Sequence, residues 1–129
     1  MKNTIIVALM LIFAFSVVYA QEKSVSRHMF ASAVVNKEPV DTITDYLPIE
    51  GGRLYYFAEL SNLQDNIVKH VWSKNGGVIF EQSFMVTSPR WRSTTSMNSA
   101  HFKAGDIVQV DVVDSAGVNY ATDILNISK

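Results

Sequence analysis

The segment IVKHVWSKNGGVIFEQSFMV, residues 67–86, contains two runs of alternating side chains joined by a turn signal. In the first run Val68, His70 and Trp72 fall on one face of an extended chain, because successive side chains of a strand point to opposite sides. The junction is Asn75-Gly76-Gly77, and Asn-Gly accepts the positive φ angles that a two-residue hairpin turn needs. The segment therefore predicts a β-hairpin.

The same period of two recurs on both sides of this hairpin. Alternating runs occupy residues 26–36, 53–60, 67–74, 78–86, 90–97, 107–114 and 118–127. Seven short strands, mostly joined by tight turns, are typical of an antiparallel sandwich. The predicted fold class is all-β, a seven-stranded antiparallel immunoglobulin-like β-sandwich, with an eight-stranded barrel as the alternative. Residues 40–52 are expected to form a long connection, in which residues 42–46 allow a short turn of helix.

The first twenty residues have the pattern of a secretory signal peptide. Lys2 supplies the positive start, and residues 5–18 form an apolar run interrupted only by Ser16. This run is shorter than the roughly 18 residues expected of a membrane-spanning helix. We therefore expect a signal peptide at residues 1–20, cleaved after Ala20, and a single β-sandwich domain at residues 21–129. An uncleaved N-terminal anchor is the alternative.

Charge and cysteine content exclude several classes of protein. The full chain has 11 Lys and Arg against 12 Asp and Glu, and loss of Lys2 leaves 10 against 12, a formal charge of −2. A chain so close to neutrality does not predict binding to nucleic acid or to an anionic membrane surface. The sequence contains no cysteine, which excludes disulfides, cysteine-based metal sites and attachment through a lipid-modified cysteine.

Several stretches resemble a known bacterial family. They are RHMFASAVVNKEPVD, YYFAELSNL, VKHVWSKNGGVIFEQSF, SPRWRSTTSM and AGDIVQVDVVDSAGVNY, in this order along the chain. Together they are similar to the family catalogued as domain of unknown function 2914, over nearly all of the chain after the signal peptide. The most specific parts are His70-x-Trp72 and Pro89-Arg90-Trp91-Arg92. The resemblance implies an exported or membrane-attached β-domain, and it supplies no catalytic residues.

The Arg90-Trp91-Arg92 motif places one aromatic ring between two cations. On a strand, Trp91 falls on one face and both arginines on the other. We expect Trp91 to point inward and the arginines outward, because unpaired charges cost more to bury. The arginines then form a solvated surface, a cationic ledge for a carboxylate, phosphate or sugar acid, or ion pairs with Glu59 or Glu81.

His70 and Trp72 share a face of one predicted strand, which favours structural packing over ligand binding. The candidate binding residues are Arg90, Arg92, Trp91, His70 and Trp72. The three histidines, His28, His70 and His101, lie in separate segments without ligand spacing, so neither a metal site nor another cofactor is predicted. The sequence contains no Gly-x-Ser-x-Gly, His-Glu-x-x-His or phosphate-binding glycine loop, and we do not expect an enzyme.

These observations predict an exported, non-catalytic interaction module of the bacterial cell envelope, periplasmic or extracellular. Its expected partner is an envelope protein or a glycan, not nucleic acid, and no stable membrane insertion is expected after signal cleavage. The alternative function is binding of a glycan or small anion through exposed aromatic rings and the Arg90/Arg92 face.

The signal peptide can be tested directly. The protein recovered from its native host should begin at Gln21, because cleavage after Ala20 removes the whole apolar run. Intact-mass measurement and N-terminal sequencing check this expectation. A chain that retains Met1 would instead be anchored at its N-terminus.

Overall fold

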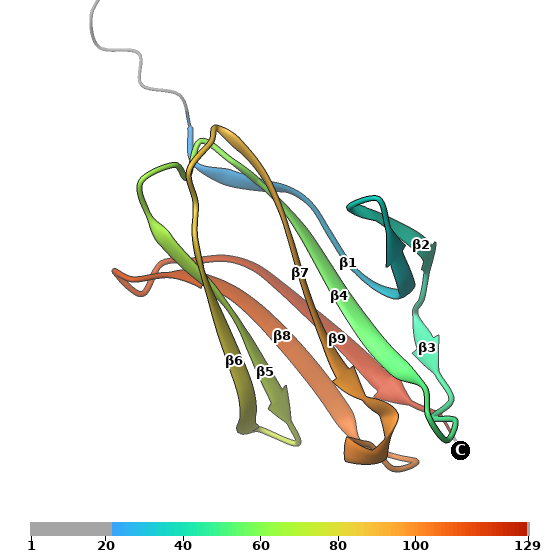
Figure 1. The fold of residues 1–129 in the computed structure, drawn as a ribbon. Coiled ribbons are helices and arrows are strands. Elements are labelled where there is room, and N and C mark those ends of the chain that lie inside the picture. The colour runs from blue at the N-terminus through green and yellow to red at the C-terminus, as the bar shows by residue number, and fades with distance from the viewer. Residues whose placement is uncertain (1–21, 129) are drawn as a thin grey trace, which may run out of the picture.

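The computed structural model describes residues 22–128, so the predicted signal peptide lies outside the described residues. Two β-sheets pack face to face as a sandwich (Figure 1). The only helical element in this part of the chain is a 3₁₀ turn, η1 (Ser99–His101). No helix in residues 22–128 has the length and apolar character needed to cross a membrane.

One sheet has four strands, in the order β2-β1-β4-β7. Their bounds are β1 Ser24–Val35, β2 Glu38–Thr42, β4 Arg53–Ser61 and β7 Arg90–Asn98. All three pairings in this sheet are antiparallel. β1 pairs with β4 only as far as Ala31, and beyond that point it pairs with β2 alone. The β1–β2 hairpin therefore leaves β4 and curls away from it (Figure 1).

The other sheet has five strands, in the order β3-β9-β8-β5-β6. Their bounds are β3 Asp45–Tyr46, β5 Ile67–Lys74, β6 Gly77–Met85, β8 Ile107–Asp114 and β9 Asn119–Ile127. The short β3 runs parallel to β9, and the other pairings are antiparallel. The chain thus crosses from one sheet to the other between β2 and β3.

The seven predicted strands are confirmed as β1 and β4 to β9, with ends that shift by one or two residues. The long connection at residues 40–52 is wrong in part, because it contains the end of β2 and all of β3. The helical turn expected at residues 42–46 is also wrong. Asn36 and Lys37 have φ angles of 52° and 61°, and this tight turn folds the chain back so that Glu38 pairs with Val35.

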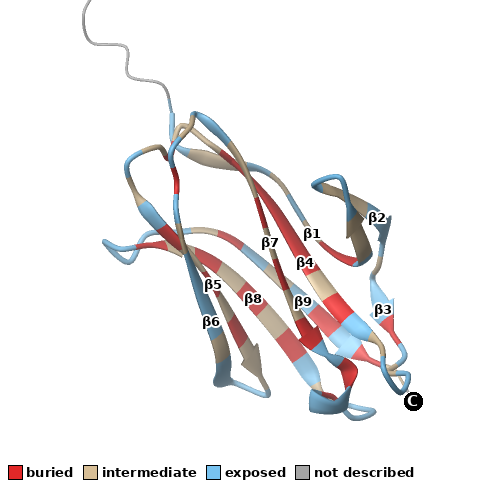
Figure 2. Ribbon diagram, viewed as in Figure 1, coloured by how far each residue is buried: buried red, intermediate tan, exposed pale blue. Residues whose placement is uncertain are grey.

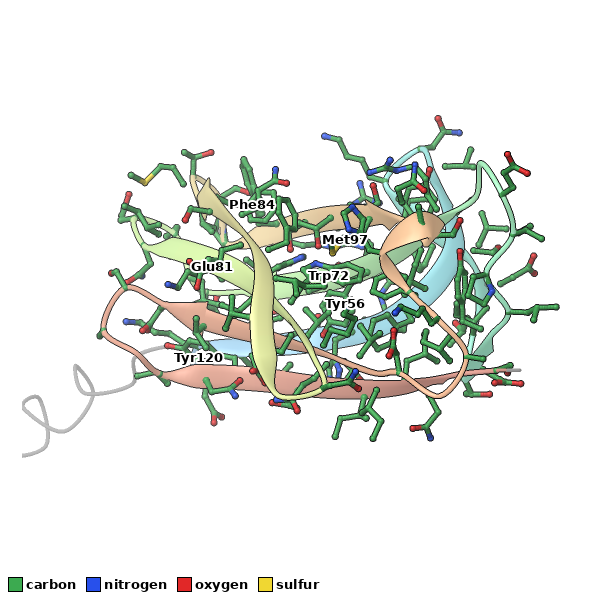
Figure 3. All side chains as sticks on the ribbon, turned by 90° about the horizontal axis from the view of Figure 1, so that it is seen from below. Tyr56, Trp72, Glu81, Phe84, Met97 and Tyr120 are labelled. Atoms are coloured by element: carbon green, nitrogen blue, oxygen red, sulfur yellow. The ribbon has the colours of Figure 1, made fainter. Side chains whose placement is uncertain are left out.

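The core lies between the sheets and follows the predicted faces of the strands (Figure 2). The inward side chains of β4 are all fully buried: Leu54, Tyr56, Ala58 and Leu60. Val108, Val110 and Val112 of β8 face them from the other sheet and are fully buried as well. Tyr56 and Trp72 meet edge to face, with ring centroids 6.5 Å apart (Figure 3). Each large apolar side chain buried in this way stabilises the fold by about 1.5–3 kcal/mol.

The predicted β5–β6 hairpin is confirmed, and its turn is fastened to the neighbouring strand. Asn75 and Gly76 have φ angles of 52° and 87°. The Asn75 backbone N–H donates to the carbonyl oxygen of Ile107 at 2.8 Å, and its side-chain Oδ1 accepts from the Ile107 N–H at 2.9 Å. Asn75 therefore joins the hairpin turn to the start of β8.

Replacing Gly76 by valine should lower the free energy of unfolding by on the order of 1 kcal/mol or more. A β-branched residue resists positive φ, although a Cβ at Gly76 would meet no other atom within 4 Å. Gly77→Val is the matched control, since a Cβ there meets only the Lys74 carbonyl oxygen, at 3.8 Å. Urea denaturation of both variants measures the difference, and equal losses would contradict this account of the turn.

Candidate functional site

His70 and Trp72 lie inside the sandwich and are fully buried. His70 Nδ1 is 2.7 Å from Thr95 Oγ1, and His70 Nε2 is 2.8 Å from Ser93 Oγ. The Trp72 indole N–H donates to the same Thr95 hydroxyl at 2.8 Å. These contacts join β5 of one sheet to β7 of the other, so both residues act in packing the sheets together.

We call the contacts that join Trp72, Thr95, His70, Ser93 and the Ala58 carbonyl the hydrogen-bond chain. The positions of the protons decide which group donates in each contact. Ser93 Oγ donates its only proton to the Ala58 carbonyl at 2.9 Å, so it accepts from His70 Nε2–H. Thr95 Oγ1 accepts from the Trp72 indole N–H and keeps its one proton for His70 Nδ1 when that nitrogen is unprotonated. The Ser93 contact places a proton on Nε2, which in neutral His70 leaves Nδ1 as the acceptor. Burial favours the same neutral form and lowers the pKa of His70 to about 3.

The two faces of β7 agree with the prediction from the Arg90-Trp91-Arg92 motif. The Arg90 side chain is 68% exposed and that of Arg92 is 30% exposed. Trp91 lies on the inward side and packs against the core, although it is half-buried because it sits at the end of the strand. Removing its ring would therefore cost less than removing a fully buried tryptophan.

Both arginines are ion-paired, and the predicted pairing with Glu59 is confirmed for Arg90. Arg92 pairs instead with Glu38, which was not among the predicted partners. Arg90 Nε donates to Glu59 Oε1, and Arg27 Nε donates to Glu59 Oε2 at 2.6 Å. Arg27 also holds Glu38 with both terminal nitrogens, at 3.0 and 3.1 Å, and Arg92 Nη1 donates to Glu38 at 2.8 Å. We call Arg90–Glu59–Arg27–Glu38–Arg92 the charge chain.

Glu59 is the buried member of the charge chain, with a side chain only 8% exposed. Burial raises the pKa of this carboxyl, but the hydrogen bonds from Arg27 and Arg90 outweigh burial and hold its pKa below the usual range. Hydrogen bonds from Arg27 and Arg92 likewise lower the pKa of Glu38. The Arg27 guanidinium lies over the ring of Phe57, 5.1 Å from its centroid. All five charges are therefore present at neutral pH.

A cleft of about 180 Å³ opens beside the two ends of the charge chain. Its lining residues are Lys37, Ser88, Arg90, Trp91 and Arg92, and we call it the basic cleft. Lys37 comes from the β1–β2 turn, and the other four come from the start of β7 and the residues before it. Within residues 22–128, Lys37 forms no ion pair. The cleft thus joins one unpaired cation to two arginines.

A separate polar cluster bridges β1 and β9. His28 Nδ1 is 2.5 Å from Asp123 Oδ2, and the Tyr56 hydroxyl donates to the same oxygen at 2.7 Å. Burial and the hydrogen bond to Asp123 raise the pKa of Tyr56, so the phenol stays protonated. His101, the third histidine, lies in η1 and forms no hydrogen bond or ion pair with this cluster. No three His, Asp or Glu side chains in the described part of the chain are placed to share a metal ion.

The comparison with protein families concerns the second half of the chain. Residues 65–123 match the model of a family described as "Protein of unknown function (DUF2914)". These residues are a DUF2914 domain. The match is shorter than the resemblance over nearly all of the chain that the sequence suggested. No curated protein matches the chain.

The DUF2914 domain runs from just before β5 to the middle of β9. It contains the Arg90-Trp91-Arg92 motif and most of the hydrogen-bond chain. It does not include Lys37, Glu38 or Glu59, so the basic cleft and the charge chain combine this domain with strands that precede it in the sequence.

Sequence reasoning assigned Arg90, Arg92 and Trp91 to the candidate site, and the structure places all three in the basic cleft. It places the other two candidates, His70 and Trp72, in the core instead. Lys37 and Ser88, which no sequence motif singled out, also line the cleft. The available signal for Lys37 was Asn36, because asparagine accepts positive φ and marks tight turns even without a following glycine.

The free energy of unfolding should fall as pH is lowered from 7 to 5, with a slope that approaches about 1.4 kcal/mol per pH unit toward pH 5. The reason is that His70 in the unfolded chain takes up a proton below its ordinary pKa of 6.5, whereas folded His70 does so only near pH 3. His70→Gln should have a much shallower slope, since an amide keeps a donor and an acceptor but does not titrate. Urea denaturation at several pH values measures both, and parallel slopes would contradict this assignment.

Proposed function

We propose that the protein is an exported, non-catalytic interaction module of the bacterial cell envelope that holds an anionic group of a protein partner in the basic cleft. The observation that carries the proposal is the convergence of Lys37, Arg90 and Arg92 on one cleft. The two carboxylates nearest these residues, Glu38 and Glu59, are already shared with Arg27. Four cations therefore face two carboxylates, which leaves positive charge for a partner's carboxylate.

The size of the cleft supports an anionic group that belongs to a larger partner. Its volume of about 180 Å³ is below the roughly 300–1,000 Å³ of ordinary small-molecule sites. Guanidinium groups suit a planar carboxylate because they offer parallel N–H donors. A side-chain carboxylate of a docked protein fits both the volume and the charge.

The alternative, a glycan-binding face built on exposed aromatic rings, has less support. Trp72 is fully buried, and Trp91 is half-buried with its ring against the core. A sugar-binding platform needs aromatic faces in water. A non-catalytic role is favoured because His70, which contacts two hydroxyl groups, is fully buried and out of reach of a substrate.

We infer that the sandwich is immunoglobulin-like. If β2 and β3 are set aside, the remaining strands in chain order take the letters A, B, C, C′, E, F and G. Strands A, B and E then lie in one sheet, and G, F, C and C′ lie in the other in that order. This division supports the inference, because immunoglobulin domains distribute these strands in the same way. Such sandwiches commonly serve as binding modules, and this supports the proposed role by analogy alone.

A hexaglutamate peptide should bind the protein and change its tryptophan fluorescence, since Trp91 lines the cleft. Lys37→Gln should weaken this binding by about tenfold, which corresponds to about 1.4 kcal/mol, because the variant loses the cation that is not ion-paired. Raising the salt concentration from 0.1 to 1 M should weaken wild-type binding as well, because it shortens the screening length from about 10 to 3 Å.

Lys103→Gln is the matched control. Lys103 is exposed in the turn before β8 and does not line the basic cleft, so this variant has the same net charge as Lys37→Gln. Equal affinity in the two variants would refute the cleft as the binding site. Unchanged thermal unfolding of Lys37→Gln confirms that the loss of binding is not a loss of structure.

A further inference from the structure

β6 forms one edge of the five-stranded sheet and has a strand neighbour, β5, on one side only. Seven of its nine residues are exposed (Figure 2). Natural edge strands are usually protected by proline, lysine or inward-pointing charge. β6 contains neither proline nor lysine, and its one charged side chain is Glu81. From Phe80 to Met85, where its pairing with β5 is regular, it therefore offers an open template for a further strand.

Large apolar side chains of β6 and of its neighbour β5 are exposed at this edge. Met85 is 57% exposed and lies beside Ile67 of β5, which is 44% exposed. On the side that faces the other sheet, Phe80 and Phe84 are only partly covered. Figure 3 shows Phe84 and Glu81 on this edge strand, away from the central Trp72.

The backbone groups on the free side of β6 belong to its odd-numbered residues. The Val86 N–H donates to the Asn66 carbonyl at 3.0 Å, so Val86 bonds toward the β5 side. Bonding direction alternates along an antiparallel strand, and the pairing is regular from Phe80 to Met85. The N–H and C=O groups of Glu81, Ser83 and Met85 therefore point to the open edge. Beyond Phe80 the ladder shifts register, and Ile79 has no partner on β5.

One antiparallel register fits β6 to a second copy of itself. It is centred on Gln82, places Phe80 opposite Phe84 twice, and places Glu81 opposite Ser83 twice. Shifting the centre by one residue to Glu81 would bring two carboxylates face to face, which is destabilising. In the Gln82 register each Glu81–Ser83 pair uses backbone groups that point outward from both strands.

The charges of Lys69 and Glu81 also favour the register centred on Gln82. Lys69 of β5 lies directly beside Ser83 and is 3.6 Å from Glu81 of its own chain. In the Gln82 register, Ser83 lies between Lys69 of its own chain and Glu81 of the second copy, in one row across the strands. The small Ser83 side chain leaves Lys69 facing that carboxylate. Each copy thus presents a cation to the carboxylate of the other.

We propose that two copies of this protein pair through antiparallel β6 strands centred on Gln82, which joins their five-stranded sheets into one continuous sheet. The pairing satisfies the free backbone groups of β6 and covers Phe80 and Phe84 of both copies. None of the residues that line the basic cleft belongs to β6. The proposal is therefore independent of the function proposed above.

The register can be tested by charge. The protein expressed from residues 1–129 should sediment as a dimer. Ser83→Glu should raise the dimer dissociation constant by about tenfold or more, because it sets two carboxylate pairs face to face, whereas the uncharged Ser83→Gln should leave the dimer nearly unchanged. In Ser83→Glu the new carboxylate lies beside Lys69 of its own chain, so the protomer is not expected to unfold. A monomeric wild type, or equal effects of both substitutions, would overturn the proposal.

The chain has no cysteine, so a single introduced thiol reports the register directly. Residue 82 lies opposite itself in a non-hydrogen-bonded pair, where Cα atoms are about 4.5 Å apart, within the range that a disulfide spans. Gln82→Cys should cross-link on mild oxidation. Ser83→Cys should not, because residue 83 lies opposite residue 81. Cross-linking of Ser83→Cys alone would show another register, and cross-linking of neither would show that β6 takes a different occupant or none.

Discussion

The sandwich depends on a chain of hydrogen bonds in which every proton is used once. Trp72 donates to Thr95, Thr95 to His70, His70 to Ser93, and Ser93 to the Ala58 carbonyl. Buried polar groups are costly unless paired, so this chain allows β7 to present hydroxyl groups to the core in place of apolar side chains. It also fixes β7 relative to β5, and the position of β7 determines where Arg90 and Arg92 emerge.

The second constraint on the site is the β1–β2 hairpin. Its tight turn at Asn36 and Lys37 brings Glu38 to Arg27 and Arg92, although Glu38 and Arg27 are 11 residues apart along the chain. Exposed ion pairs contribute little to stability individually, yet these pairs share members with the buried Glu59. The ion pairs of Glu38 therefore hold the hairpin in place, so that Lys37 forms one wall of the basic cleft. The DUF2914 domain supplies the other wall.

Much of the fold could be predicted from the sequence because alternation is a local signal. The faces of β4, β5 and β8 follow directly from their period of two, and the Asn75-Gly76 turn follows from its dipeptide. β3 has two residues and shows no period, so no local pattern indicates it. The site was predicted only in part: Arg90-Trp91-Arg92 is contiguous in the sequence, whereas Lys37 reaches the same cleft through a hairpin whose path depends on tertiary contacts. His70 and Trp72 lie in the interior, as their shared strand face indicates. Their hydroxyl partners, Ser93 and Thr95, come from the other sheet, and a face pattern cannot reveal them.

The charge chain has an odd number of members and therefore ends in a cation on both sides. Its two ends, Arg90 and Arg92, both line the basic cleft. An anion held between them would be the sixth member and would convert an open line of charges into a closed ring of alternating sign. In that ring every charge has two neighbours of opposite sign, so the occupant would complete an arrangement that the protein already holds in place.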